Sequence, residues 1–164
     1  MMNKRNKKGF TLVELLIVVA IIAVLVAISI PIFLTELEKS KEATDIANIR
    51  AGYAQAREAA ILGDDTLEED DGVSDGMFVA GGISSETGEE DNYYTFRGEL
   101  VQGKDGWQCD DVEVAGIKLS EFVGEPTQDG WFQIECTSDG WVQITLGKGS
   151  QRKTVTSTTV TGGN

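Results

Sequence analysis

A run of twenty residues from Leu15 to Leu34, interrupted only by Ser29 and Pro31, constrains this 164-residue chain most strongly. As an α-helix the run measures about 30 Å, which matches the hydrocarbon core of a bilayer. Glu14 stands directly before it. A carboxylate in hydrocarbon costs at least ~2.5 kcal/mol, so the sequence predicts a membrane-spanning helix whose one acidic residue needs a compensating partner.

Two ordinary membrane segments fit this start incompletely. A secretory signal peptide is disfavoured, because the apolar run is too long and no small-residue cleavage site follows it. A plain signal anchor explains the basic start and the span. It leaves Gly9, Phe10 and Glu14 without an explanation.

The stretch from Lys7 to Pro31 resembles the type IV prepilins and the related pseudopilins. In that pattern Gly9 precedes the cleavage site, Phe10 is the first mature residue, Glu14 is the fifth, and an apolar helix containing Pro31 follows. The resemblance covers roughly the first quarter of the chain in detail, and the helix in pattern.

The resemblance implies processing and assembly. A prepilin peptidase would cut between Gly9 and Phe10 on the cytoplasmic side and N-methylate Phe10. Subunits held in the membrane would then assemble, with a pilus assembly platform, into a homo-oligomeric helical filament. In such a filament Glu14 meets the amino group of Phe10 on a neighbour, which would fix the register between subunits. A second interpretation stays open: Glu14 lies only about 6 Å from the new N-terminus and could reach water at the headgroup level.

The charges flanking the apolar run predict its orientation. After the run, basic and acidic residues are mixed. Before it, all the charges are positive, and positive charge marks the cytoplasmic side. The N-terminus is therefore expected in the cytoplasm and the C-terminal part outside, later on a surface filament. The basic residues are Lys4, Arg5, Lys7 and Lys8.

Composition excludes several function classes. The chain carries 14 basic and 27 acidic residues, a net charge of −13, and no histidine. An acidic surface repels phosphates, so we expect no direct binding of nucleic acid. The usual general base and the commonest metal ligand are missing, and no catalytic, zinc or nucleotide motif is present. We therefore expect neither an enzyme nor a cofactor or metal.

Beyond the membrane the helix is predicted to continue as an amphipathic segment. Apolar and small residues recur at steps of three and four from Ile46 to Ala60, the helical period. One helix from about Phe10 to Leu62 is expected, loosened at Pro31 and stopped by Gly63. The expected organisation is a leader (1–9), an assembly helix (10–34), an amphipathic helix on a sheet (35–62), an acidic loop region (63–92) and a sheet domain (93–164).

Strand signals dominate the C-terminal part, so the predicted fold class is α+β, with the helix packed on a small antiparallel sheet. The last three strands read as a meander whose aliphatic faces meet the helix. The expected strands are Met77–Ala80, Tyr93–Phe96, Val112–Ile117, Trp131–Cys136, Trp141–Leu146 and Thr154–Val160.

Cys109 and Cys136 both fall in the part expected outside the cell, where an oxidising environment permits a disulfide. Two buried free thiols are the alternative. The bridge would stabilise the fold by roughly 3–4 kcal/mol in the chain-entropy model.

Two further features suggest binding without establishing it. Residues 63–76 hold seven acidic side chains, but their spacing lacks a calcium-loop pattern, so a solvated loop is expected. Asp-Gly-Trp occurs three times, which fits turns followed by strands. Trp131 and Trp141 share the polar face, however, and an exposed aromatic pair can mark a contact surface.

The leading hypothesis is a structural subunit of a type IV pilus or related filament, serving adhesion, motility or DNA uptake. A pseudopilin of a type II secretion-like system is the first alternative. The second is a membrane-tethered extracellular binding module that recognises a ligand through Trp131 and Trp141 or the acidic loop.

Overall fold

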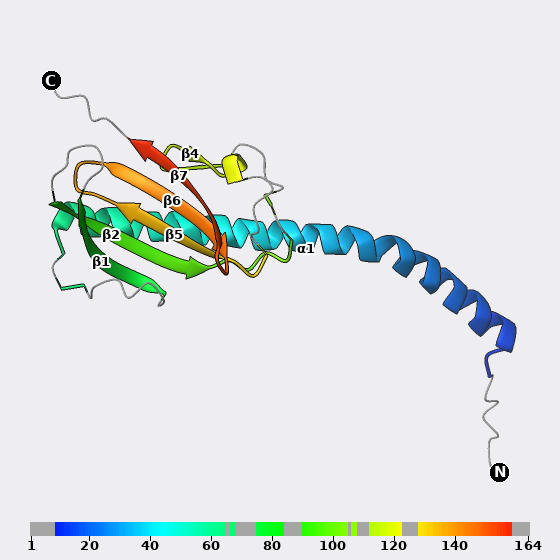
Figure 1. The fold of residues 1–164 in the computed structure, drawn as a ribbon. Helices are drawn as coiled ribbons and strands as arrows, with labels where there is room; N and C mark the ends of the chain where they lie inside the picture. The colour runs from blue at the N-terminus through cyan, green and yellow to red at the C-terminus, as the bar shows by residue number, and fades with distance from the viewer. Residues whose placement is uncertain are drawn as a thin grey trace, which may run out of the picture. The chain divides into compact units, whose positions relative to one another are not determined.

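The computed structural model describes residues 9–64, 66–67, 75–83, 90–104, 106–107, 112–122 and 128–158. The chain divides into two compact units, Met1–Leu37 and Glu38–Asn164. A single α-helix, α1 (Leu12–Leu62), contributes to both (Figure 1). The combination of this helix and an antiparallel sheet confirms the predicted α+β class.

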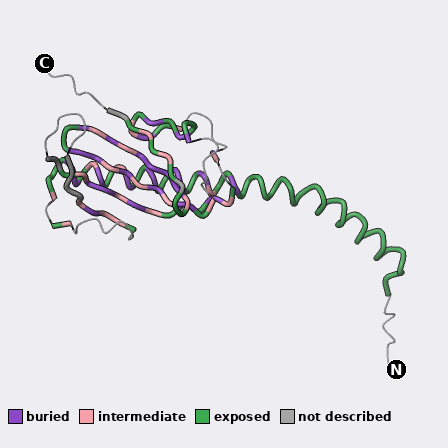
Figure 2. The backbone as a smooth tube through the Cα atoms, in the orientation of Figure 1, coloured by how far each residue is buried: buried purple, intermediate pink, exposed green. Residues whose placement is uncertain are grey.

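The first unit is a helix whose surface is apolar on every side. Each residue from Gly9 to Leu37 is exposed, which Figure 2 shows as an unbroken green tube. Pro31 lies inside the helix, and no break in the helix is assigned there. The hydroxyls of Ser29 and Thr35 donate to the carbonyls of Leu25 and Pro31, at 2.7 and 3.1 Å. We expected Pro31 to loosen the helix, but α1 continues through it without interruption.

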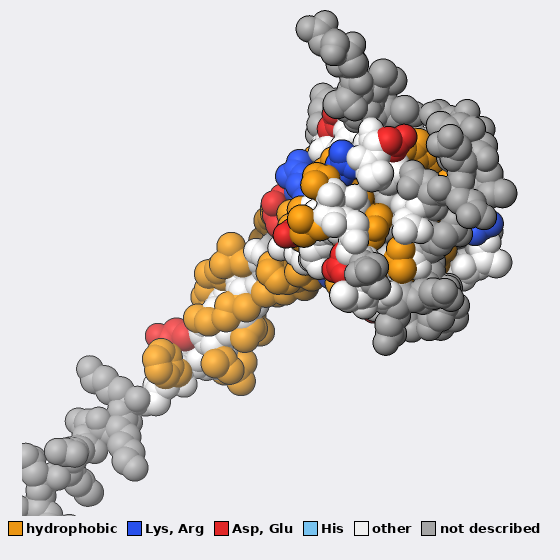
Figure 3. Space-filling model, turned by 90° about the vertical axis from the view of Figure 1, so that its left-hand side faces the viewer, with side chains coloured by type: hydrophobic (Ala, Val, Ile, Leu, Met, Phe, Trp, Pro, Cys, Tyr) orange, Lys and Arg blue, Asp and Glu red, His pale blue; other side chains and the backbone are white. Residues whose placement is uncertain are grey.

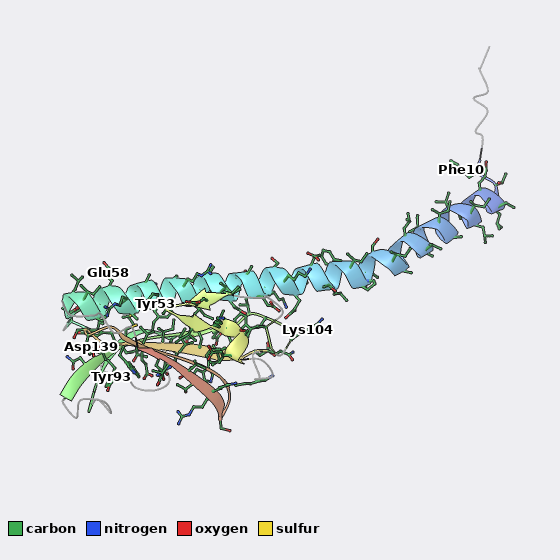
Figure 4. The ribbon with its side chains drawn as sticks, turned by 90° about the horizontal axis from the view of Figure 1, so that it is seen from above. Phe10, Tyr53, Glu58, Tyr93, Lys104 and Asp139 are labelled. Carbon is green, nitrogen blue, oxygen red and sulfur yellow. The ribbon has the colours of Figure 1, made fainter. Side chains whose placement is uncertain are left out.

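The second unit packs the rest of α1 against a five-stranded antiparallel sheet with the order β1-β2-β5-β6-β7. Figure 4 shows α1 running along one side of this sheet. The predicted meander of the last three strands is confirmed, and β7 lies at an edge as expected. The bounds are β1 (Gly76–Ile83), β2 (Glu90–Glu99), β5 (Trp131–Cys136), β6 (Trp141–Lys148) and β7 (Gln151–Thr158).

The core lies between α1 and the facing side of the sheet. Ile46, Ile49 and Ala56 of the helix cluster with Phe132, Ile134 and other alternate residues of the strands. The predicted aliphatic faces therefore do meet the helix. Side chains of a short hairpin and of the 3₁₀ turn η1 (Leu119–Phe122) join the same core.

The expected strand Val112–Ile117 is wrong as a single element. The structure has two strands of two residues, β3 (Glu113–Val114) and β4 (Ile117–Lys118), paired antiparallel. Ala115 and Gly116 between them have φ of 55° and 79°. Two successive residues with positive φ form the tight hairpin turn that matches strand twist, so the chain reverses there.

The end of α1 is set by Gly63, as predicted. Gly63 has φ of 63°, and its N–H donates to the carbonyl of Ala59 at 2.9 Å. Asp64 N–H donates to the same carbonyl at 3.3 Å. A glycine in the left-handed region closes a helix in this way at no steric cost.

At Gly52, α1 approaches the sheet closely, because a Cβ there would overlap the ring of Phe96. We expect Gly52→Ala to lower the free energy of unfolding by about 1–3 kcal/mol, since overpacking outweighs the better helix propensity of alanine. Denaturant unfolding of the detergent-solubilised chain measures this. The neighbouring exposed Ala51→Ser should change stability by less than about 0.5 kcal/mol. Equal stability of the two variants would contradict the close approach.

Candidate assembly segment

The candidate functional site lies at the N-terminal end of α1 and begins at Gly9. Gly9, Phe10 and Thr11 precede α1 without regular secondary structure, and Phe10 is 90% exposed. Apart from its chain neighbours, no described residue lies within 4 Å of where a Cβ on Gly9 would be. The bond between Gly9 and Phe10 is therefore uncovered by the described part of the chain.

Thr11 and Glu14 form a reciprocal cap on the first turn of α1. The Thr11 hydroxyl accepts the Glu14 N–H at 3.2 Å, and Glu14 Oε2 accepts the Thr11 N–H at 2.8 Å. The Thr11 hydroxyl also donates to Oε2 at 2.8 Å. This is a capping box, in which a threonine and a glutamate three residues later satisfy each other's orphan N–H groups. The spacing T-x-x-E before an apolar run is the sequence pattern of a capping box, and it could have predicted this cap.

The cap uses only one oxygen of the Glu14 carboxylate. Both hydrogen bonds from Thr11 end on Oε2, and Oε1 has no partner among the described residues. A carboxylate accepts several hydrogen bonds, so a cation can still approach Glu14 from the open side. Glu14 can therefore hold its own helix start and still receive a positive group from outside the chain.

Aliphatic side chains from Leu12 to Leu37 surround the helix that follows. The large ones are between 43% and 80% exposed, and they cover the visible side of this unit in Figure 3. By length and composition α1 contains one candidate membrane span, and none of its apolar window is buried within the molecule. A signal sequence would pass the same test, so the span alone does not identify the segment.

Comparison with known proteins identifies what kind of N-terminal segment this is. Residues 4–30 match the family model of the prokaryotic N-terminal methylation motif. Over 114 residues the chain is 35% identical to "Prepilin peptidase-dependent protein D" of Escherichia coli strain K12, covering 62% of this chain and 75% of that protein. The chain belongs to the type IV pilin and pseudopilin family. Pilin-family membership implies processing by a prepilin peptidase and assembly into filaments.

A second relative of this chain is "Type IV major pilin protein PilA" of Myxococcus xanthus strain DK1622. The identity is 51% over 51 residues, which is 31% of this chain and 23% of the relative. No solved structure gives a significant match. The likeness to PilA therefore concerns a segment of 51 residues and leaves most of both proteins unmatched.

The expected disulfide of the pilin remains a prediction. Cys136 is a free, fully buried thiol, and burial raises its pKa to about 12. Cys109 lies outside the described residues. Most of the acidic loop, including Asp65 and Glu68, also lies outside them, and the described part of the chain holds no cluster of acidic, cysteine or histidine side chains suited to a metal.

The two candidate tryptophans do not form one exposed pair. Trp131 pairs with Gly147 at one end of β5, whereas Trp141 begins β6 at the other end. Both are half-buried, and Trp141 packs edge-on against Tyr93, with ring centroids 5.5 Å apart. Their role in a surface contact remains a prediction, but any such contact must span the sheet.

The structure also shows an acidic clamp that the sequence did not predict, formed by Glu38 and Asp45 on one face of α1. Both side chains are almost fully buried, at 5% and 0% exposed. Glu38 Oε1 accepts the N–H groups of Gly103 and Lys104 at 2.6 and 2.8 Å. The Asp45 carboxylate accepts those of Val101 and Gln102 at 2.8 and 3.0 Å. Two helix carboxylates thus hold the segment after β2 by its backbone.

The clamp is built around a close approach at Gly103. A Cβ there would lie 3.0 Å from Lys41 Nζ and 3.1 Å from Glu38 Oε2. Burial is the largest influence on Asp45 and raises the pKa of its carboxyl, while the two backbone donors partly oppose the rise. Burial disfavours the charged carboxylate, and the hydrogen bonds from Val101 and Gln102 offset part of that penalty.

We expect Asp45→Asn to destabilise the pilin by about 1–3 kcal/mol, because one buried N–H then faces an amide NH₂ instead of an acceptor. A raised pKa in the folded state means that the contribution of Asp45 is full below its unfolded pKa and is lost as pH rises through the folded value. The stability gap between the pilin and Asp45→Asn should therefore narrow from pH 4 to pH 7. Denaturant unfolding at each pH measures it.

Asp139 provides a control, because the pKa of its carboxyl is shifted in the opposite direction to that of Asp45. Hydrogen bonds from the Thr137 hydroxyl and the Trp141 N–H lower the pKa of its carboxyl. The contribution of Asp139 is present above its unfolded pKa and is lost as pH falls, so the gap for Asp139→Asn should widen as pH rises. If both gaps move in the same direction, the account of Asp45 is wrong.

Proposed function

We propose that this protein is the structural subunit of a type IV pilus or a closely related filament. The observation that carries the proposal is the helix from Leu12 to Leu37, which is apolar on all sides and uncovered by any described part of the chain. It directly follows the methylation motif. A subunit of this kind rests in the membrane first and buries the same surface against other subunits afterwards.

The proposed processing removes residues 1–9 between Gly9 and Phe10, with N-methylation of Phe10. The leader contains four basic and no acidic residues, so the mature chain keeps ten basic and twenty-seven acidic side chains, a net charge of −17. The positive leader orients the N-terminus to the cytoplasm, which places the sheet unit outside. The acidic mature surface makes adhesion or motility a better fit than direct contact with DNA.

Cleavage depends on the size of residue 9. A Cβ on Gly9 meets no described residue, so a substitution there leaves the fold intact and reports on the peptidase alone. We expect Gly9→Ala to be processed and Gly9→Leu to remain uncut. Intact-mass analysis of the cell-derived protein distinguishes the two, with the wild type starting at a methylated Phe10. A wild-type chain that still begins at Met1 or Met2 would refute the processing.

Assembly depends, in this proposal, on Glu14 meeting the terminal ammonium of Phe10 on a neighbouring subunit. Oε1 is the oxygen available for that ion pair, because Oε2 is engaged by Thr11. In an apolar surround, a carboxylate left without a cation is strongly disfavoured, so only arrangements that align the two groups are stable. The contact thereby fixes the register of the filament, with Pro31 further along the same surface.

Two substitutions separate the charge of Glu14 from its capping role. Glu14→Gln keeps a capping acceptor but removes the charge, since glutamine also completes a capping box. Thr11→Val removes the cap, at about 1 kcal/mol, and keeps the charge. We expect Glu14→Gln to abolish filaments, because an unpaired buried ammonium costs about 3–5 kcal/mol per contact. Thr11→Val should still assemble.

Counting surface filaments by electron microscopy, with total subunit measured by immunoblot, provides the readout. Normal filaments from Glu14→Gln would show that the charge pair is unnecessary. If Thr11→Val lost its filaments while Glu14→Gln kept them, Glu14 would act in capping alone.

A further inference from the structure

The sheet of the second unit has one face turned away from α1, here called the outer face. Strand alternation and pairing assign its central residues: Arg97 on β2, Gln133 and Glu135 on β5, and Gln143 on β6. Figure 4 shows the α1 helix on the opposite side. On this face Arg97 is buried, Gln133, Glu135 and Gln143 are half-buried, and Thr156 on β7 is exposed.

The central polar side chains of this face form one hydrogen-bonded row across four strands. Arg97 donates to Gln133 Oε1 at 3.1 and 2.7 Å. Gln133 and Gln143 donate their amide N–H groups to opposite oxygens of Glu135. Thr156 on β7 donates to Gln143 Oε1 at 3.4 Å. The row is held in place before any ligand arrives, which lowers the entropic cost of binding.

Half-buried aromatic rings flank this row, one group at each end of β5 along the strand direction. Tyr93 and Trp141 lie in edge-to-face contact beside the β5–β6 turn. Trp131 lies at the opposite end of β5, opposite Gly147. The two ends are about six residues apart, roughly 20 Å at about 3.4 Å per residue. The outer face thus carries a polar row that crosses the strands between two aromatic sites, and these sites are far enough apart for an extended occupant.

The face is neutral although the chain is strongly acidic. Its described charges are Arg97 and Glu135 in the row, with Glu99 and Arg152 near the Trp131 end, two of each sign. The whole chain carries −13. A neutral face neither attracts nor repels a charged polymer, so the electrostatics match an uncharged occupant.

The unused groups of the row resemble neither a protein interface nor an anion site. Gln133 and Gln143 each keep a spare N–H, and Glu135 keeps spare lone pairs, so donors and acceptors alternate along the row. The exposed large aliphatic residues of the described second unit are Ile61, Leu62 and Val101, none of them on this face. A protein partner needs an apolar centre, whereas a chain of hydroxyl groups needs mixed donors and acceptors with flat rings to stack on.

We propose that the outer face binds a neutral polysaccharide, with the sugar rings stacking on Trp131 at one end and on Trp141 with Tyr93 at the other. The row from Gln133 to Thr156 hydrogen-bonds the hydroxyl groups between them, and Arg97 holds Gln133 in place. The inference rests on the proposed function only for the exposure of this face in a filament, where α1 would lie inward. Binding itself needs no assembly.

The experiment uses the full chain in a detergent without a sugar headgroup, sedimented with microcrystalline cellulose or chitin, and with alginate beads as the anionic comparison. We expect retention on at least one neutral polymer, unchanged between 50 mM and 1 M NaCl. Trp131→Leu and Trp141→Leu should each weaken binding about tenfold, and Trp131→Phe should restore most of it. Ile61→Ser, which removes an exposed apolar side chain from the last turn of α1, is the matched control and should bind normally.

Two further variants keep the test decisive if a tryptophan variant fails to fold. Gln143→Met and Thr156→Val remove polar groups without removing a ring and should each weaken binding about two- to tenfold. Absence of retention on both neutral polymers, retention abolished by salt, or equal binding by all outer-face variants would overturn the proposal. Each of these results leaves the filament test of Glu14→Gln unaffected. Self-association that is lost in the same variants, without retention on a polymer, would assign the face to a second copy and likewise overturn it.

Discussion

The rest of the molecule depends on an apolar surface that the described chain does not cover. From Leu12 to Leu37 no described residue of α1 is buried, yet large aliphatic side chains occupy every side of the helix. Burying one such side chain is worth about 1.5–3 kcal/mol, and a domain's net stability is only about 5–15 kcal/mol. The folded sheet unit cannot offset that exposure in water. The cover must come from lipid or from other protein chains, which is why one surface serves both anchoring and assembly.

Within such an apolar surface the Glu14 carboxylate is tolerated because Thr11 already supplies hydrogen bonds to one of its oxygens. The Thr11 hydroxyl and N–H hold Oε2, and the same contacts close the first turn of α1. The local cap leaves Oε1 pointing to no described partner, so the carboxylate still favours a cation from outside. A carboxylate with both oxygens satisfied locally would discriminate little between registers. One with neither satisfied would fray the helix start, because the orphan N–H groups would lose their acceptor.

The sequence predicted those elements whose cause is local and failed where the cause is long-range. Helical periodicity and Gly63 located the end of α1, and alternation located the β5–β6–β7 meander. The hairpin within residues 112–118 was read as one strand, because an alanine at positive φ gives no turn signal. The acidic clamp was invisible, because the partners of Glu38 and Asp45 are backbone N–H groups about 60 positions away, which carry no side-chain signature. The separation of Trp131 from Trp141 required the strand register.

The clamp and the overall charge respond differently to salt. Asp45 and Glu38 accept backbone N–H groups in buried positions, and buried interactions are screened little, so ionic strength has weak leverage on the fold of the sheet unit. The net charge, −17 once residues 1–9 are removed as proposed, produces a long-range repulsion between copies, which salt screens strongly. Association of copies through the apolar part of α1 must therefore overcome a repulsion between subunits, in addition to the self-repulsion within each subunit. Salt should accordingly affect assembly more than it affects the buried contacts of the clamp.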